Sequence, residues 1–223
     1  PRSTLDRSSA ASDVYKRHGL TEDWSYLAFE PLVEGGANPI LYFDFDYSKN
    51  PSKAWDHVFG LEASVNNAEY TTDTPSGSGH AMDLTSSANG NVHISNAVAL
   101  NIASSVDQVS VSYWHKTTET PDRSSFWANP GRAMQAHNPW SNGNIYWDTA
   151  GCCDASTQRI NADATDSVVW DEWNHFVFIK AGENKEIWVN GELFLDGVNT
   201  NPLPSNIDTL WIGSGENGGN SLR

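Results

Sequence analysis

Short segments typical of β-strands recur along this chain at regular intervals, and they restrict its fold more than any other feature. Most links between them are clusters of Gly, Asn, Asp or Pro, the residues of tight turns. The expected strands are 40–46, 79–84, 91–94, 109–115, 144–148, 173–180, 186–189, 192–195 and 209–213. Many short strands at this spacing predict an all-β fold, a two-sheet antiparallel sandwich or jelly roll.

Asn-Gly pairs mark three turns within this pattern. The pair at 89–90 separates segments 79–84 and 91–94, and further pairs lie at 142–143 and 190–191. Asn-Gly suits a two-residue turn because both residues accept a positive φ. Segments 79–84 and 91–94 are therefore expected to form a hairpin.

Residues 1–39 show no sustained hydrophobic period. They are Ser-rich at the start and contain a cluster of turn residues before Ile40. A short helix from Thr21 through Trp24 and Leu27 is the one element this segment suggests. We expect 1–39 to be an irregular leader or linker, and one domain to cover 40–223.

The charge balance excludes several partners. The chain has 13 Lys+Arg against 28 Asp+Glu, a formal net charge of -15. Such a chain is a poor ligand for nucleic acid or for anionic membranes. No apolar run approaches the roughly 20 residues needed to span a bilayer. The acidic, Lys-poor composition suits a secreted or cell-surface protein, and the lack of Asn-X-Ser/Thr sequons favours a bacterial one.

The only cysteines, Cys152 and Cys153, are neighbours in the sequence. Adjacent residues close no long loop, and two ligands do not make a structural zinc site. Two interpretations remain, a pair of free thiols or a vicinal disulfide that forces an unusual turn. In an oxidising compartment we expect the disulfide.

Several segments together resemble one family. The stretch 170–197 has a Trp-x-His strand, a hairpin and a strand ending in Val-Asn-Gly, and 79–94, 109–116 and 210–213 match in order. These pieces resemble the laminin-G-like, concanavalin-A-like jelly roll. Segment 138–148, with the cysteine pair and Arg159, is similar to a bacterial branch of secreted or surface-protein modules.

The resemblance also implies a closing strand that pairs with the first strand. That strand, of the Gly-x-Ile-Asp-Asp type, does not follow segment 210–213 here. Two interpretations follow. Either the domain is truncated at its C-terminal end, or the sheet has an open edge beside Ile40 to Asp46, where an unpaired apolar strand invites association.

Residues 132–159 hold the best candidates for a binding site. A lectin site needs aromatic faces for the apolar side of a sugar, and Asn, Asp or Arg for its hydroxyls. Trp140 and Tyr146 are the expected stacking residues, and Tyr146 should point away from its neighbour Trp147. The remaining expected ligand-binding residues are Asn142, Asp148, Arg159, Cys152 and Cys153.

These residues predict a carbohydrate-binding module that does not cleave its ligand, with a neutral glycan favoured by the charge. A structural interpretation is equally open: Trp140 packs, Asp148 pairs with Arg159 and the cysteines fix a turn. In that case the domain is a spacer in a large adhesin.

An enzyme is the remaining alternative. Gln135 and His137 have the spacing of the Gln-Ile-His strand of alginate lyases, and Arg132 is near them in the sequence. The Tyr-x-Lys-x-Gly-x-Tyr string of those lyases is missing, as is the Glu-x-Asp-x-x-Glu string of laminarinase-like glycoside hydrolases. A polysaccharide lyase therefore remains only an alternative. Calcium is a candidate cofactor, with Asp44 and Asp46 as its ligands on one strand face.

Overall fold

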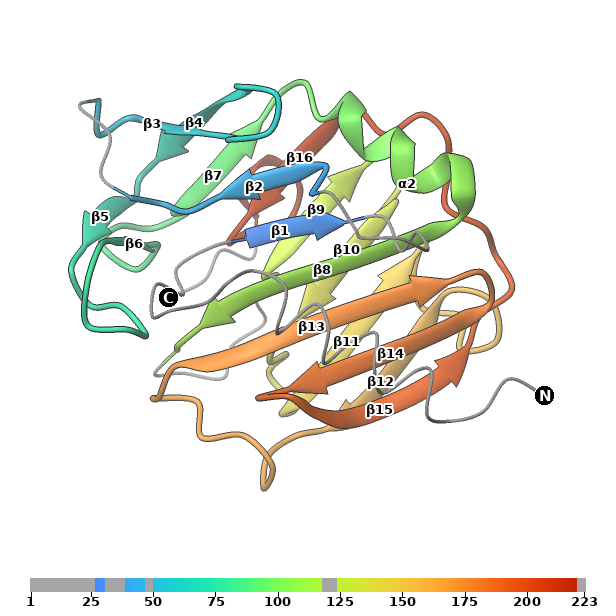
Figure 1. Cartoon of the computed structure of the whole chain (residues 1–223). Coiled ribbons are helices and arrows are strands. Elements are labelled where there is room, and N and C mark those ends of the chain that lie inside the picture. The colour runs from blue at the N-terminus through green and yellow to red at the C-terminus, as the bar shows by residue number, and fades with distance from the viewer. Residues whose placement is uncertain (1–26, 31–38, 47–49, 118–123, 220–223) are drawn as a thin grey trace.

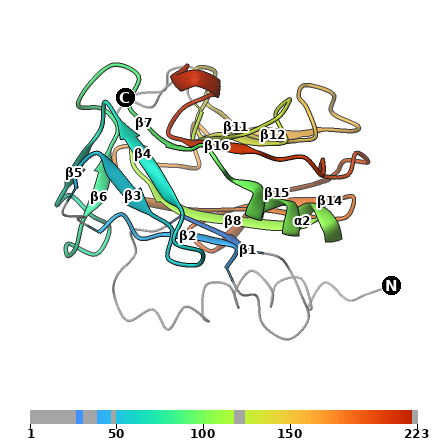
Figure 2. The same ribbon diagram turned by 90° about the horizontal axis from the view of Figure 1, so that it is seen from above.

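The computed structural model describes residues 27–30 (as backbone), 39–46, 50–117 and 124–219. Two antiparallel sheets pack face to face, which confirms the predicted sandwich (Figure 1; Figure 2 shows the two layers from above). The first sheet has the order β15 (Glu192–Val198), β14 (Asn184–Val189), β13 (Asn174–Ala181), β8 (Gln108–His115), β1 (Leu27–Glu30), β2 (Leu41–Phe43).

The second sheet is the wider one. Its order is β12 (Arg159–Asp163), β11 (Asn144–Thr149), β10 (Met134–His137), β9 (Phe126–Asn129), β16 (Thr209–Ile212), β7 (Asn91–Ile94), β4 (Glu62–Asn66), β3 (Lys53–Trp55). Strands β5 (Glu69–Thr71) and β6 (Ala81–Asp83) form a separate pair. The short helices of the described residues are η1 (Val98–Leu100), α2 (Asn101–Val106) and η2 (Glu216–Gly218). In the described part of the chain no helix is both long and apolar enough to cross a membrane.

Aromatic side chains fill the space between the sheets. Tyr113 and Phe178 from the first sheet meet Phe126 and Trp147 from the second, with ring centroids 5.7–6.1 Å apart between the sheets. The alternation of the strands directs these residues inward, and Phe126, Trp147 and Phe178 are fully buried. Rings at this separation contribute both burial and edge-to-face attraction.

The hairpin predicted around Asn89-Gly90 is not formed. Strand β6 pairs with β5, whereas β7 lies between β16 and β4 in the second sheet. Gly90 instead passes close to other backbone, since a Cβ there would lie 2.3 Å from the carbonyl oxygen of Leu84. The glycine is needed for this close approach. The turn at Asn190-Gly191 does join β14 to β15, with both residues at positive φ.

The first sheet begins inside the segment predicted as a leader. Backbone pairing places β1 between β8 and β2. The helix suggested around Trp24 lies outside the described residues, apart from Leu27, which belongs to β1. The apolar residues 27–29 show no alternation, so the sequence did not predict a strand there. Backbone pairing with β2 and β8 defines β1.

Strand β2 ends the first sheet, at the edge predicted to be open. The N–H of Tyr42 donates to Asp56 Oδ1 (2.8 Å), and the N–H of His57 donates to the Tyr42 carbonyl (2.8 Å). Asp56 is buried and also accepts from the N–H groups of Val58 and Phe59. The segment after β3 therefore satisfies the peptide groups of Tyr42 that face away from β1.

Candidate functional site

The outer face of the second sheet gathers most of the predicted site residues. Cross-strand register places Gln135 of β10 opposite Asp148 of β11, and Asp148 opposite Arg159 of β12. Two residues further along each strand, His137 lies opposite Tyr146. These side chains share one face because strand residues alternate between the two faces of a sheet. Trp147 points into the core, so Tyr146 points outward as predicted.

A buried ion pair organises this face. Asp148 is fully buried, and its two oxygens accept hydrogen bonds from Nε and Nη2 of Arg159, both at 2.6 Å. Gln135 Nε2 donates a third bond to Asp148 Oδ2 (2.6 Å). The hydrogen bonds to Asp148 raise the pKa of Arg159 above its ordinary value. Asp148 therefore positions Arg159, and the ion pair of the structural interpretation is confirmed.

The fixed guanidinium covers an aromatic ring. Arg159 Cζ lies 4.5 Å from the ring centroid of Tyr146, and both side chains are partly exposed. This distance is within the range of a cation–π interaction. The ion pair with Asp148 thus sets the position of a half-exposed aromatic and basic surface.

His137 is enclosed between rings on the same face. Its ring centroid lies 4.4 Å from that of Trp140 and 5.9 Å from that of Tyr146. Gln135 Nε2 lies 2.8 Å from His137 Nε2, and Ser124 Oγ lies 3.3 Å from Nδ1. Since the Gln135 amide group also donates to Asp148, its second proton goes to His137 Nε2, which then accepts.

The loop between β10 and β11 is held by its own hydrogen bonds. The N–H of Trp140 donates to the Asn144 carbonyl (2.9 Å), and Asn142 Nδ2 donates to the Tyr146 hydroxyl (2.8 Å). Gly143 has φ +81°, and a Cβ there would lie 2.3 Å from Thr165 Oγ1. Trp140 is half-buried and Asn142 is exposed. The loop therefore presents both residues in a fixed arrangement beside Tyr146.

The cysteine pair lies at the opposite end of the same strands. Cys152 and Cys153 form the predicted vicinal disulfide. Arg132 Nη1 contacts Cys152 Sγ, and the Arg132 guanidinium lies 4.7 Å from the Trp127 ring centroid. Six residues of extended chain separate Ala150 from Asn144, about 20 Å at the rise of a β-strand. The disulfide is thus remote from Trp140, and the predicted site divides into two groups.

The residues of the lyase alternative are not brought together at an exposed point. Gln135 and His137 are buried, with relative exposures of 0% and 6%. Both engage in the hydrogen bonds described above, whereas Arg132 lies with the disulfide. This geometry leaves the predicted trio without a shared surface for substrate.

Asp44 and Asp46, the expected calcium ligands, follow β2. Asp44 Oδ2 lies 2.9 Å from His57 Nε2, and Asp46 Oδ1 accepts a hydrogen bond from the N–H of His80 (3.0 Å). Within the described ranges, no group of three or more His, Cys, Asp or Glu residues could hold a metal ion. Calcium binding at these two residues stays a prediction.

Sequence reasoning missed some residues at and near these sites. Asn161 of β12 is exposed and lies opposite Tyr146. It was missed because strand β12 was not recognised in the sequence. Trp55, His57 and Tyr70 line a pocket with Asp44 and Asp46. The alternation of Lys53, Ala54 and Trp55 was the sequence pattern that indicated strand β3 beside this pocket. Three residues are too few to predict a strand.

Solved structures with a similar fold are binding domains of botulinum neurotoxins. The receptor binding domain of mosaic serotype C/D has a TM-score of 0.56 at 17% identity, covering 80% of this chain and 43% of the other. The serotype DC binding domain in complex with SialylT has a TM-score of 0.53 at 17% identity, with coverages of 78% and 43%. The same domain with rat synaptotagmin II gives 0.50 at 16%, with coverages of 74% and 44%.

The chain thus spans less than half the length of these structures, and the likeness concerns the fold. A search of curated proteins finds no match. A laminin G family model, described as "Concanavalin A-like lectin/glucanases superfamily", matches residues 85–223. That range contains most of the connection between β6 and β7 and every strand from β7 onward. The chain belongs to the concanavalin A-like lectin/glucanase superfamily.

Proposed function

We propose that this domain binds a neutral glycan without cleaving it, as a module of a larger secreted or cell-surface protein. The observation that carries the proposal is the half-exposed surface of Trp140, Asn142, Tyr146 and Arg159 on the second sheet. Both the ion pair with Asp148 and the loop hydrogen bonds hold this surface in place. We refer to these four residues as the glycan face.

The glycan face has the groups that sugar recognition needs. The rings of Trp140 and Tyr146 offer apolar surface to the C–H groups of a sugar. The Arg159 guanidinium uses Nε and Nη2 on Asp148, which leaves Nη1 as a donor to a hydroxyl or ring oxygen. Asn142 is exposed and offers an amide beside the Tyr146 hydroxyl. Asp148 acts through Arg159 and does not touch the ligand, because it is fully buried.

The charge of the chain favours a neutral glycan over an anionic one. A net charge of -15 repels sulfated or uronic polymers at long range, and the single Arg159 on the face offsets little of it. The fold neighbours add support for a binding role. One is a toxin binding domain in complex with SialylT, and another is in complex with rat synaptotagmin II.

A glycan array with and without calcium tests the proposal. The expected result is binding of uncharged glycans by the unaltered domain and its loss in Trp140→Ala. Phe59→Ala is the matched control, because Phe59 is an exposed aromatic residue that follows β3, the strand at the opposite edge of the second sheet from β12. Melting temperatures of all three proteins are measured alongside.

Retention of the melting temperature together with loss of binding in Trp140→Ala alone would support the glycan face. Absence of binding by the well-folded domain to every glycan on the array would overturn the proposal and favour the spacer alternative. Binding confined to sulfated or uronic glycans would contradict the preference for a neutral ligand. Glycan binding that requires calcium would show that the ion takes part in binding.

A further inference from the structure

A pocket lies where the two sheets end. Strand β2 is the last strand of the first sheet and β3 the last of the second, and both are at the same end of the sandwich (Figures 1 and 2). The pocket has a volume of about 230 Å³ and opens to solvent. It is lined by Asp44, Phe45, Asp46, Ala54, Trp55, His57 and Tyr70. We call these seven residues the edge pocket.

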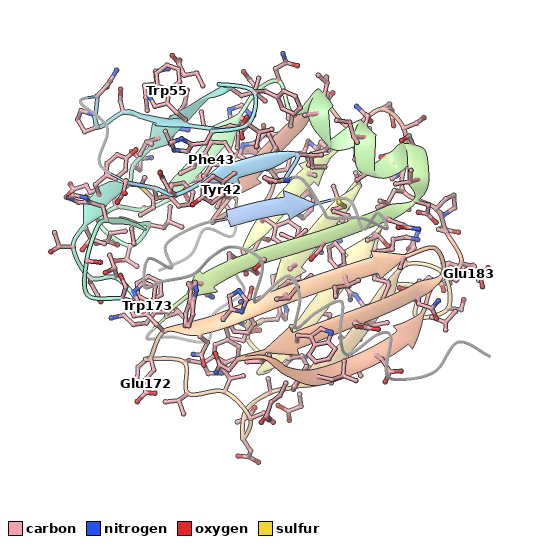
Figure 3. The ribbon with its side chains drawn as sticks, in the orientation of Figure 1. Tyr42, Phe43, Trp55, Glu172, Trp173 and Glu183 are labelled. Atoms are coloured by element: carbon pink, nitrogen blue, oxygen red, sulfur yellow. A yellow bond between two sulfur atoms is a disulfide. The ribbon has the colours of Figure 1, made fainter. Side chains whose placement is uncertain are left out.

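Aromatic rings make up much of its wall. Phe45, Trp55 and Tyr70 come from three different segments, and Phe45 stacks on the buried Phe43 with a centroid distance of 5.9 Å. Trp55 is 44% exposed, an unusual position for so large an apolar side chain. Figure 3 shows Trp55 at the outer rim of the molecule, beyond the strand that carries Tyr42 and Phe43.

Carboxylates supply the polar part of the edge pocket. Asp46 has a side chain 56% exposed, and only its Oδ1 takes part in the contacts with His80. Asp44 faces His57 at 2.9 Å. The described residues that line the pocket include neither Lys nor Arg. The described lining of the pocket is therefore negative, in a protein with a net charge of -15.

The polar groups of the pocket are mainly acceptors. The Tyr70 hydroxyl donates to the Lys53 carbonyl (2.7 Å), and His57 Nε2 faces Asp44. A sugar needs donors for its own oxygens as well as acceptors for its hydroxyls. An alkylammonium group has only donors or C–H groups, a positive charge, and a strong preference for aromatic faces. The combination of rings and carboxylates matches the ammonium group better than it matches a sugar.

We propose that the edge pocket binds an organic ammonium group, with Trp55 and Tyr70 as its aromatic walls and Asp46 as its counter-ion. The proposal is independent of the glycan face, which uses other residues on the outer face of the second sheet. The ammonium group could belong to a small molecule or to a lysine side chain.

Titration of the domain with choline tests this proposal, followed by isothermal calorimetry and by the indole N–H resonances in NMR. The neutral isostere 3,3-dimethyl-1-butanol has the same shape without the charge, and Nα-acetyl-lysine amide presents a lysine side chain. We expect choline or the lysine derivative to bind and the neutral alcohol to bind at least about tenfold more weakly, the effect of 1.4 kcal/mol. Whichever of the two cations binds more tightly identifies the source of the ammonium group.

Two variants assign the binding to the edge pocket. Asp46→Asn keeps the acceptor for the His80 N–H and removes the charge, and Trp55→Ala removes the exposed ring. Each is expected to weaken cation binding about tenfold or more. Asp171→Asn is the matched control, because it removes one exposed negative charge far from β2 in the sequence and should leave binding unchanged.

Equal affinities for choline and the neutral alcohol would overturn the proposal. So would unchanged binding in both Asp46→Asn and Trp55→Ala, or an equal loss in Asp171→Asn, which would indicate only general charge attraction. If calcium rather than either cation shifts the indole resonance of Trp55, the pocket is a calcium site and the ammonium proposal fails. Loss of glycan binding in Trp140→Ala is a separate result and bears on none of these outcomes.

Discussion

Asp148 and Asp46 show how burial changes the role of the same side chain. Both lie near aromatic rings, but the side chain of Asp148 is 0% exposed and that of Asp46 is 56% exposed. Asp148 accepts three side-chain hydrogen bonds and uses its charge to hold Arg159 over Tyr146. The contacts of the Asp46 side chain with His80 use Oδ1 alone. The buried carboxylate therefore builds a surface, whereas the exposed one can meet a ligand directly.

Removal of the buried charge should give the largest effect. Asp148→Asn leaves Arg159 without its counter-ion and is expected to lower the free energy of unfolding by about 3 kcal/mol, because breaking a buried pair leaves a charge uncompensated. Urea denaturation measures the loss. Asp171→Asn, which removes an exposed charge, serves as the control. A change below about 1 kcal/mol in Asp148→Asn would show that solvent already compensates Arg159.

The loop that presents Trp140 and Asn142 should be the next most sensitive. Gly143→Ala places a methyl group at positive φ and 2.3 Å from Thr165 Oγ1, so we expect a loss of about 2 kcal/mol together with weaker glycan binding. Gly182→Ala is the control, since Gly182 has a similar positive φ with open space around its Cβ position. Equal losses in the two variants would mean that strain in φ alone is responsible. Calorimetry and the glycan array measure the two effects.

A buried lysine close to Asp148 should make stability depend on pH. Burial lowers the pKa of Lys185 well below 10.5, while the charge of Asp148 opposes the shift; Nζ donates to the Trp147 carbonyl (2.7 Å). Below pH 10.5 the unfolded chain binds this proton more readily than the folded one, so folding is penalised as pH falls. The penalty is complete below the folded-state pKa and vanishes above pH 10.5.

The difference in unfolding free energy between the unaltered domain and Lys185→Met isolates this contribution. It should rise with pH in the alkaline range below 10.5, by at most about 1.4 kcal/mol per pH unit. Lys53→Met, at a partly exposed lysine paired with Glu62, provides the comparison. A flat difference for Lys185→Met across that range would contradict the proposed penalty.

The exposed carboxylate should have the smallest effect on stability. Asp46→Asn keeps the hydrogen bond from His80 and is expected to change the free energy of unfolding by no more than about 0.5 kcal/mol. A larger loss, measured by the same urea titration, would show that Asp46 is a structural residue like Asp148. The contrast between the two aspartates would then no longer hold.

The long, alternating strands were predictable from the sequence, and the short ones were not. Segments 109–115 and 173–180 correspond to the central strands β8 and β13. The first was predictable from its alternation and the second from an apolar run bounded by turn residues. Strands such as β3, with three residues, gain their structure from pairing with β4. The hairpin predicted at Asn89-Gly90 was wrong because that pair serves a close backbone approach.

The arrangement of the candidate site residues was only partly predictable from the sequence. The outward direction of Tyr146 followed from alternation. The ion pair between Asp148 and Arg159 was only one of two open interpretations, because the strand that carries Arg159 was not recognised. The separation of the cysteine pair from Trp140 could not be predicted in this way. It depends on the pairing of β10 with β11, which places Trp140 at one end of these strands and the cysteines at the other. Closeness in sequence says little once two residues lie at opposite ends of a strand.

The segment after β3 has a consequence for crowding. An edge strand with unpaired backbone N–H and C=O groups can pair with a strand from another copy of the same module. At high local concentration this edge-to-edge pairing leads to aggregation. In β2 the outward N–H and carbonyl of Tyr42 are already engaged by Asp56 and His57. A strand from a neighbouring copy of this domain therefore could not pair with the backbone of Tyr42, and the sheets of adjacent copies would not join there.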